Sequence, residues 1–419
     1  MRAHEGQDDD VDRPATSFEQ MWADLLPMGR HPSTGGYRRY AWTPTDAGLR
    51  EWFTGEAGRR GLDVTTDRAG NLWAWTGDPD SAAAAGRPGL VVGSHLDSVP
   101  DGGAFDGPLG VVSAFAALDQ LRARGWSPRR PVGVACFADE EGARFGVACA
   151  GSRLLTGVLD ADRARSLTDD DGTTMAEALT ACGRDPGTLG ADEEALRRIG
   201  TFLELHVEQG RGLVHADGGR GAAVGVASAI WPHGRWRLDL RGRADHAGTT
   251  RLADREDPMP ALAAAILEAR AAAGRHGSLA TVGKVRVEPN GVNAIPSAVT
   301  AWLDARGPSE DGVRAVVADV GGAAGTTPVL ESWTPTTAFD RGLRDRLATL
   351  LGDGDGSAAP VLPTGAGHDA GILAAAGIPS AMLFVRNPTG VSHSPAEHAE
   401  PADCLAGVAA LARAVEALA

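Results

Sequence analysis

The chain has 419 residues, enough for two or three domains of ordinary size, and its 43% apolar and 23% charged side chains are typical of a globular protein. Its 40 basic and 55 acidic side chains give a formal net charge of −15. This charge argues against a general binder of nucleic acid or of anionic membranes, because both need a basic surface. No apolar run approaches the length of about 20 residues that a membrane span needs.

The first residues, MRAHEGQDDDVDRPATS, are charged and polar. We therefore predict a disordered tail over residues 1–19 and, since an apolar export signal is not seen there, a cytoplasmic protein. The four cysteines form no CxxC pair, so we expect reduced thiols rather than disulfides.

Apolar runs alternate with helical patterns in the first half of the chain. The runs 89–94, 131–138 and 202–208 are predicted to be strands, of which 131–138 is buried, and 110–125 is predicted to be a helix. This alternation predicts an α/β fold with a mainly parallel sheet. Polar residues follow each of the three strands, at the sheet edge where such folds collect their ligands.

The pattern changes over residues 216–328. The segments 236–244, 281–288 and 299–306 alternate polar with apolar residues, and 257–274 has a helical pattern. Half-exposed strands with a helix predict a small α+β domain inserted into the first one.

After the insert, the alternation of helices and strands returns. We predict helices over 338–351, 368–376 and 402–418 and a strand over 380–385. The sequence thus predicts one catalytic domain that is split into residues 20–215 and 329–419.

The polar residues at the predicted strand ends include candidate metal ligands. His95 and Asp97 form an HxD pair, in which side chains two apart on a strand share a face, so that the carboxylate can orient the imidazole. Asp106 follows in a glycine-rich loop before the 110–125 helix, where glycine permits a tight turn. For either motif alone, a surface histidine or an ordinary glycine-rich loop is the better interpretation.

A third cluster, Asp139-Glu140-Glu141, directly follows a buried strand. Adjacent carboxylates raise one another's pKa unless a cation is present, although a solvated acidic turn would explain this cluster alone. In a metal site, one carboxylate would be a ligand and its neighbour a general base, but the residues alone do not tell Glu140 from Glu141. His206 and His393, also beside apolar runs, complete a donor set that fits two divalent cations.

Seven segments extend these motifs: GSHLDSVPDGGAFDGPLGV, ADEEGARFG, LELHVEQG, ADHAGTT, VNAIPS…LDAR, GAGHDA and GVSHSPAEH. Together they resemble the amidase/hydantoinase/carbamoylase family of the dinuclear metallopeptidase superfamily, from about residue 20 to the C-terminus. The resemblance implies two divalent ions per subunit, Zn²⁺, Mn²⁺ or Co²⁺, with Asp106 as the bridging ligand. It implies the ligands His95, Asp106, Glu141, His206 and His393. Glu140 would be the general base, and Asp97 would orient His95.

The same resemblance implies substrate contacts. His246 in ADHAGTT would stabilise the developing oxyanion, and Asn293 in VNAIPS would hydrogen-bond the substrate. Arg306 in LDAR would bind a substrate carboxylate with both arms of its guanidinium group. Gln209 would contact the ureido end of the substrate, with His368 in GAGHDA nearby.

A linear ureido or N-carbamoyl carboxylate is the substrate class that the resemblance implies. Within this class we expect allantoate, and hence a role in purine breakdown, with N-carbamoyl-L-amino acids or N-carbamoyl-β-alanine as the alternative. The resemblance also implies a homodimer formed through the insert, which would act as a lid and dimerisation domain. Arg251 stands where the family usually has proline, and we expect a surface arginine there.

Two other hypotheses are less favoured. A metal-dependent binding or assembly protein without catalysis would not need Glu140 beside a full ligand set. A dipeptidase or aminoacylase of the wider superfamily fits LELHVEQG and DHAGTT less well.

Overall fold

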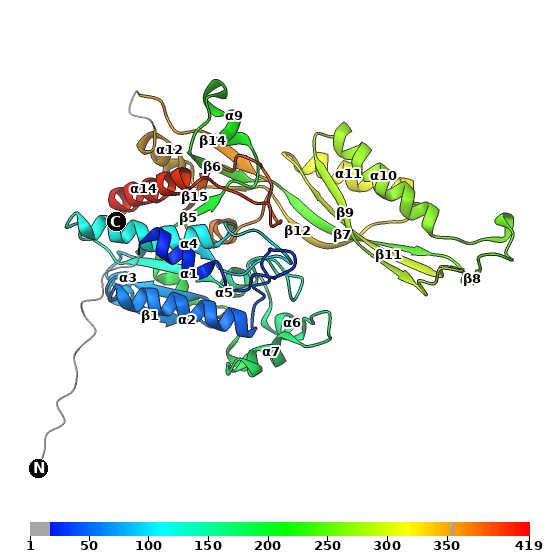
Figure 1. Ribbon diagram of the computed structural model, residues 1–419, viewed down its shortest axis with the longest axis horizontal. Coiled ribbons are helices and arrows are strands. Elements are labelled where there is room, and N and C mark those ends of the chain that lie inside the picture. The colour runs from blue at the N-terminus through cyan, green and yellow to red at the C-terminus, as the bar shows by residue number, and fades with distance from the viewer. Residues whose placement is uncertain (1–16, 353–355) are drawn as a thin grey trace, which may run out of the picture. The chain divides into compact units, whose positions relative to one another are not determined.

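The computed structural model describes residues 17–352 and 356–419 (Figure 1). The chain divides into two compact units. Unit 1 contains the chain up to Ser228 with Phe339–Leu362 and Gly367–Ala419, and unit 2 contains Ala229–Ala338 and Pro363–Ala366. Of the tail predicted over residues 1–19, only 17–19 lie within the described part, and Phe18 already begins a helix.

The largest sheet has nine strands. They are β1 (Asp63–Thr66), β2 (Leu72–Trp75), β3 (Gly89–His95), β4 (Val132–Phe137), β5 (Ile199–Val207), β6 (Val224–Ile230), β13 (Thr337–Ala338), β14 (Val361–Thr364) and β15 (Ser380–Val385). Their order is β1-β2-β4-β3-β5-β15-β6-β13, with β14 beside β6. The four central strands β4, β3, β5 and β15 run parallel, and antiparallel pairs flank them. The predicted α/β fold with a mainly parallel sheet is therefore confirmed.

Helices pack around this sheet. They are α1 (Phe18–Leu25), α2 (Pro44–Arg59), α3 (Pro79–Ala84), α4 (Pro108–Ala123), α5 (Ala150–Leu155), α6 (Ala161–Ser166), α7 (Met175–Ala181), α8 (Glu193–Arg197), α9 (Gly212–Gly219), α12 (Arg341–Leu350), α13 (Asp369–Ala375) and α14 (Pro401–Leu418), with a 3₁₀ turn at Pro186–Thr188. Helix α4 packs against β3, β5 and α14. All residues of β3, β4 and β15 are buried, which explains their continuous apolar sequences.

The predicted strands and helices of unit 1 are all present, within a few residues of the predicted bounds. The short helices α5 to α8 were not predicted, because five to seven residues carry little periodic signal. The starts of α6, α7 and α8 are instead defined by capping side chains: Asp160, Thr174 and Asp192 each accept a hydrogen bond from a backbone N–H in the first turn.

Unit 2 is an antiparallel sheet with two helices. Its elements are β7 (His233–Arg241), β8 (Asp245–His246), α10 (Met259–Arg275), β9 (Leu279–Glu288), β10 (Ala294–Ile295), β11 (Ala298–Arg306), α11 (Glu310–Ala324) and β12 (Val329–Thr334), with a 3₁₀ turn at Leu252–Asp254. The sheet order is β12-β7-β11-β9, and β8 pairs with β10. Buried residues alternate along β7 and β11, and the buried face packs against α10 and α11. The predicted α+β arrangement of this region is therefore present.

The insert predicted over 216–328 and unit 2 share most of their residues but have different bounds. The chain enters unit 2 only at Ala229, because β6 pairs with β15 in the large sheet up to Val226. A role as lid and dimerisation domain stays a prediction. Among the described residues, no helix is both long and apolar enough to cross a membrane.

Candidate dinuclear metal centre

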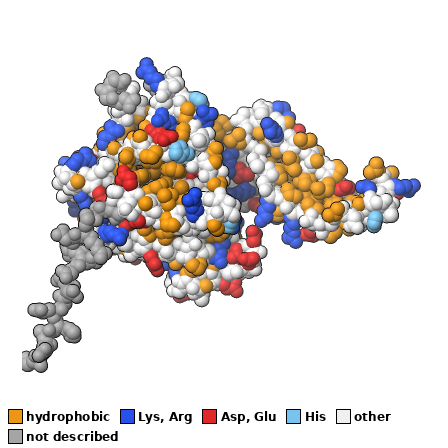
Figure 2. All heavy atoms as spheres, in the orientation of Figure 1, with side chains coloured by type: hydrophobic (Ala, Val, Ile, Leu, Met, Phe, Trp, Pro, Cys, Tyr) orange, Lys and Arg blue, Asp and Glu red, His pale blue; other side chains and the backbone are white. Residues whose placement is uncertain are grey.

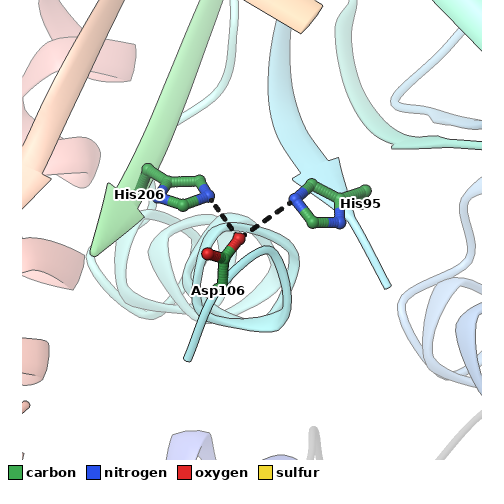
Figure 3. A group of neighbouring side chains, drawn as sticks. All are labelled: His95, Asp106 and His206. Atoms are coloured by element: carbon green, nitrogen blue, oxygen red, sulfur yellow. Dashed lines mark ion pairs between the residues drawn. The ribbon is translucent and has the colours of Figure 1, made fainter. Parts of the chain in front are cut away.

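The parallel strands of unit 1 bring three of the predicted motifs to one edge of the sheet. His95 is the last residue of β3, and His206 is the last but one of β5. Asp139-Glu140-Glu141 follows β4 after one residue, Ala138. Since β3 runs parallel to β4 and to β5, these strands end on the same side. The side chains of His95 and His206 both point to the loop before α4, which carries Asp106 (Figure 3).

Asp106 lies between the two histidines. Its Oδ1 is 3.2 Å from His206 Nε2 and 3.5 Å from His95 Nε2, so three donor atoms surround one point. The loop can approach this closely because Gly107 has φ of +85° and no side chain: a Cβ there would lie 2.4 Å from the His95 ring. The glycine-rich loop thus positions Asp106 through close backbone approach.

The second oxygen of Asp106 belongs to another donor group. His393 Nε2 is 3.6 Å from Asp106 Oδ2 and 3.5 Å from Glu141 Oε2. His393 lies in the loop between β15 and α14, with φ of +55°. The structure therefore brings the five predicted ligands together as two groups, one of His95, Asp106 and His206 and one of Asp106, Glu141 and His393.

The histidines are oriented as metal-binding imidazoles usually are. His206 Nδ1 is 2.8 Å from the carbonyl oxygen of Val207, and His95 Nδ1 is 3.1 Å from that of Asp97. Because a carbonyl only accepts, each Nδ1 carries a proton, and each Nε2 faces Asp106. His206 Nε2 is buried and has no hydrogen-bond partner within the described part of the chain. Burial lowers the pKa values of both imidazoles, but the nearby carboxylates, Asp106 among them, outweigh this and raise them above the usual value. A cation between Nε2 and Asp106 would take the place of the proton that attracts them to each other.

Asp97 has a different set of contacts from the one predicted. Its side-chain oxygen is 3.5 Å from His95 Nδ1, but its two carboxylate oxygens accept hydrogen bonds from the backbone N–H groups of Glu140 (3.1 Å) and Glu141 (3.0 Å). Asp97 therefore fixes the backbone that carries the candidate base and one candidate ligand, in addition to its contact with the imidazole.

Glu140 is buried beside the first donor group. Its Oε2 is 3.7 Å from His95 Nε2, and its Oε1 accepts a hydrogen bond from the Cys149 thiol at 3.3 Å. Nothing in the sequence indicated the contact with Cys149, which lies in an irregular loop before α5. The structure thus separates Glu140 from Glu141 by position, since only Glu141 is within 4 Å of His393 among the described contacts.

Glu140 and Glu141 are hard to ionise in this centre, whereas Asp106 ionises easily. Burial raises the pKa values of Glu140 and Glu141 well above their usual range, and Asp97 raises both further. Burial also raises the pKa of Asp106, but His206 and His95 outweigh this effect and hold it well below its usual range. Two divalent cations would bring +4 into a centre lined by Asp97, Asp106, Glu140 and Glu141, and so would stabilise the ionised forms of Glu140 and Glu141.

Two residues that were predicted to contact the substrate, Gln209 and His368, lie against the candidate metal ligands. Gln209 Nε2 donates to Asp106 Oδ2 at 2.9 Å rather than pointing freely outward. The buried ring of His368 lies 4.5 Å from the His206 ring, and its nitrogens have no hydrogen-bond partner among the residues described. Burial and the nearby imidazoles lower the pKa of His368 well below its usual value, so this ring is neutral. With Glu204, it forms a further donor group around His206.

The other predicted contacts lie in unit 2. His246 on β8 and Asn293 beside β10 are both exposed. They are neighbours, because the Ala247 N–H donates to the Asn293 carbonyl oxygen and His246 pairs with Ala294. Arg306, at the end of β11, donates from Nε and Nη2 to Asp304 and from Nη1 to the Gly365 carbonyl oxygen.

Comparison with known proteins agrees with this geometry. Residues 91–417 match the model of peptidase family M20/M25/M40. The chain belongs to this family. It is 35% identical to the N-carbamoyl-L-amino acid amidohydrolase of Geobacillus stearothermophilus, over 96% of this chain and 98% of that one. It is 31% identical to the allantoate amidohydrolase of Escherichia coli K12, over 95% and 97% of the two chains.

Solved structures of this family have the same fold. A hydantoinase/carbamoylase family amidase from Burkholderia vietnamiensis superposes with a TM-score of 0.83 at 30% identity, covering 96% of this chain and 97% of its own. The resemblance drawn from the motifs is thus confirmed, and the protein is a metal-dependent hydrolase that acts on C–N bonds. Its donor groups fit a dinuclear metal site.

Proposed function

We propose that this M20 enzyme hydrolyses the carbamoyl or ureido C–N bond of a small carboxylate. The observation that carries this proposal is the Asp106 carboxylate shared by two donor groups beside the buried Glu140. We favour allantoate, and hence purine breakdown, as the first candidate. An N-carbamoyl-L-amino acid is the second, supported by the relative at 35% identity.

The residues present fit two divalent cations. His95 and His206 would hold one, Glu141 and His393 would hold the other, and Asp106 would contact both. When bound, such ions supply Lewis-acid activation of water and of the substrate carbonyl. The donor set suits Zn²⁺, Mn²⁺ or Co²⁺.

Glu140 is the proposed general base. Its carboxylate takes a proton from the attacking water and then delivers that proton to the leaving nitrogen. The Cys149 thiol holds one of its oxygens, and Asp97 fixes its backbone, so the other oxygen faces His95 and the donor groups. Burial raises the pKa of Glu140 and so disfavours the ionised form that a general base needs. The charge of bound cations would offset this effect.

His246 is the proposed donor to the oxyanion. Its Nδ1 accepts a hydrogen bond from the backbone N–H of Gly248 at 3.0 Å, so the proton of the neutral ring is on Nε2. An Nε2–H group stabilises negative charge that develops on a carbonyl oxygen. Asn293 beside it supplies a further hydrogen bond to the substrate.

Arg306 is the proposed carboxylate clamp. Asp304 and the Gly365 carbonyl oxygen hold the guanidinium group in one orientation, which reduces the entropy lost when a substrate carboxylate binds. Arg251, by contrast, is 83% exposed and pairs with Asp254, as expected for a surface arginine.

The positions of these groups in unit 2 favour a dimer. Arg306 is the last residue of β11, and Ala298 is its first. His246 and Asn293 lie beyond the Ala298 end. Eight residue steps of about 3.4 Å separate the two ends by about 27 Å, too far for one small substrate to touch both. We therefore propose that His246 and Asn293 act on the substrate of a second subunit.

Unit 2 also exposes apolar side chains that a subunit contact would cover. They include Ile266, Leu267, Leu279 and Val285 on α10 and β9. Figure 2 shows hydrophobic side chains gathered on the visible face of this unit. Subunit mixing tests the arrangement: His246→Ala and Arg306→Ala chains, each inactive alone, should regain activity when mixed if His246 acts across a dimer. Mixtures that stay inactive would contradict it.

Ammonia release tests the proposed reaction. Chelated enzyme is reloaded with Mn²⁺, Zn²⁺ or Co²⁺ and assayed on allantoate, N-carbamoyl-β-alanine and several N-carbamoyl-L-amino acids. We expect turnover of one class, with allantoate first. Turnover of none of them would refute the proposed function.

A further inference from the structure

A buried carboxylate supports the loop that carries Asp106. The side chain of Glu397 comes from the loop between β15 and α14 and is only 6% exposed. Its Oε2 accepts hydrogen bonds from the backbone N–H groups of Phe105 at 2.9 Å and Asp106 at 3.2 Å. Its Oε1 is buried and has no hydrogen-bond partner in the described part of the protein. The hydrogen bonds of Oε2 are therefore made to the backbone of the Asp106 loop.

The loop is shaped to receive this carboxylate. A Cβ atom at Gly103 would lie 1.9 Å from Glu397 Oε2 and 2.5 Å from Glu397 Cβ, so only glycine leaves room for it. The requirement here is space rather than an unusual backbone angle. Gly103 and Glu397 are thus two sides of one packed contact between chain segments nearly 300 residues apart.

The segment that carries Glu397 meets Asp106 a second time. Ser392 Oγ donates to Asp106 Oδ2 at 3.1 Å, and His393 lies 3.6 Å from the same oxygen. A turn, closed by a hydrogen bond from Glu397 N to Ser394 O, connects these residues to Glu397. The same short segment therefore holds the Asp106 side chain at one point and its backbone at another.

We infer that Glu397 is a positioning residue of the metal centre, which fixes the Asp106 backbone relative to His393. One oxygen that accepts two successive N–H groups defines the local backbone conformation, and with it the direction of the Asp106 carboxylate. Asp106 belongs both to the donor group of His95 and to the donor group of His393, so a change in the direction of its carboxylate affects both groups. Residues that orient metal ligands typically change metal affinity 10- to 100-fold when removed.

Metal titration of chelated protein tests this role without any substrate. Calorimetry with Mn²⁺ should show that Glu397→Ala binds at least one ion about 10- to 100-fold more weakly than the wild type. Glu397→Gln should stay within about threefold, because the amide oxygen can accept both N–H groups. Since no reaction is measured, the result is independent of the proposed function.

Glu56→Ala is the matched control. Glu56 is also fully buried in unit 1, but its carboxylate pairs with Arg60 on helix α2 at 2.6 Å. We expect this variant to lose thermal stability and to keep its metal affinity. Thermal unfolding of each metal-free variant shows how much stability it has lost.

Gly103→Ala provides a second test if Glu397→Ala fails to fold. The added methyl group would displace the Glu397 carboxylate without removing it, so metal binding should weaken in the same direction. Wild-type metal affinity in both Glu397→Ala and Gly103→Ala would overturn the inference. Equal weakening in Glu397→Gln and Glu397→Ala, or in Glu56→Ala, would also overturn it, because charge or general stability would then explain the effect.

Discussion

Asp67 should make the protein less stable as the pH rises from acid to neutral. This carboxyl group is buried and accepts hydrogen bonds from Asn71 and from the Trp73 indole. Burial raises its pKa from 3.8 to about 6, although these hydrogen bonds lower it. The folded state therefore keeps the proton at a pH where the unfolded state has lost it.

The sign and size of the effect follow from this difference in pKa. Because the folded pKa is the higher one, the contribution of Asp67 to stability is fully present below pH 3.8 and is lost as the pH rises through about 6. Proton linkage gives a loss of about 2.5 kcal/mol between pH 4 and pH 7. Asp67→Asn removes this titration, while its other effects on stability do not depend on pH.

Urea unfolding followed by tryptophan fluorescence measures this contribution. The free energy of unfolding is determined for metal-free wild type and for Asp67→Asn at several values between pH 4 and pH 7, at low protein concentration because the pI is about 5.2. The wild-type value minus the variant value should fall by about 2.5 kcal/mol over this range. A difference that stays constant with pH would refute the reasoning.

Three further predictions concern the metal centre and the substrate clamp. Glu140→Gln should lower kcat by about 10²- to 10⁴-fold while calorimetry shows metal binding within about threefold of wild type; unchanged kcat would exclude Glu140 as the base. Arg306→Lys should raise KM for the carboxylate substrate about tenfold, because lysine lacks the planar fork. Arg237→Lys is its control, since Arg237 also pairs with an aspartate two residues along its strand, Asp239 on β7, and should leave KM unchanged. Gly107→Ala should lower stability by about 1–3 kcal/mol and weaken metal binding, because the residue has φ of +85° and faces the His95 ring. Gly125→Ala, at φ of +73° with no atom within 4 Å of the added methyl, should lose stability but keep metal affinity.

The strand ends explain why much of the centre could be predicted from the sequence. Buried parallel strands have continuous apolar sequences, and polar residues that follow them must collect at one edge of the sheet. His95, His206 and the Asp139-Glu140-Glu141 cluster were found in this way, whereas only the family resemblance distinguished Glu141 from Glu140. The pairing of Arg306 with Asp304 was also open to prediction, because residues two apart on a strand share a face.

Contacts between irregular segments could not be predicted in the same way. Glu397 reaches the Asp106 loop from 291 residues away, and Cys149 reaches Glu140 from a loop without periodic pattern. Asp97 was expected to orient His95, but its carboxylate also binds two backbone N–H groups whose position depends on the turn after β4. Such contacts depend on tertiary packing, which leaves no spacing rule in the sequence.

Asp106 offers one oxygen to each of the two donor groups, and this makes the occupancies of the two positions thermodynamically linked. A first cation would offset negative charge on the shared carboxylate and repel a second cation, so the second would bind more weakly. By reciprocity, whatever factor the first ion imposes on the second, the second imposes on the first. At limiting metal concentration the protein would therefore exist as three populations: empty, singly loaded and doubly loaded.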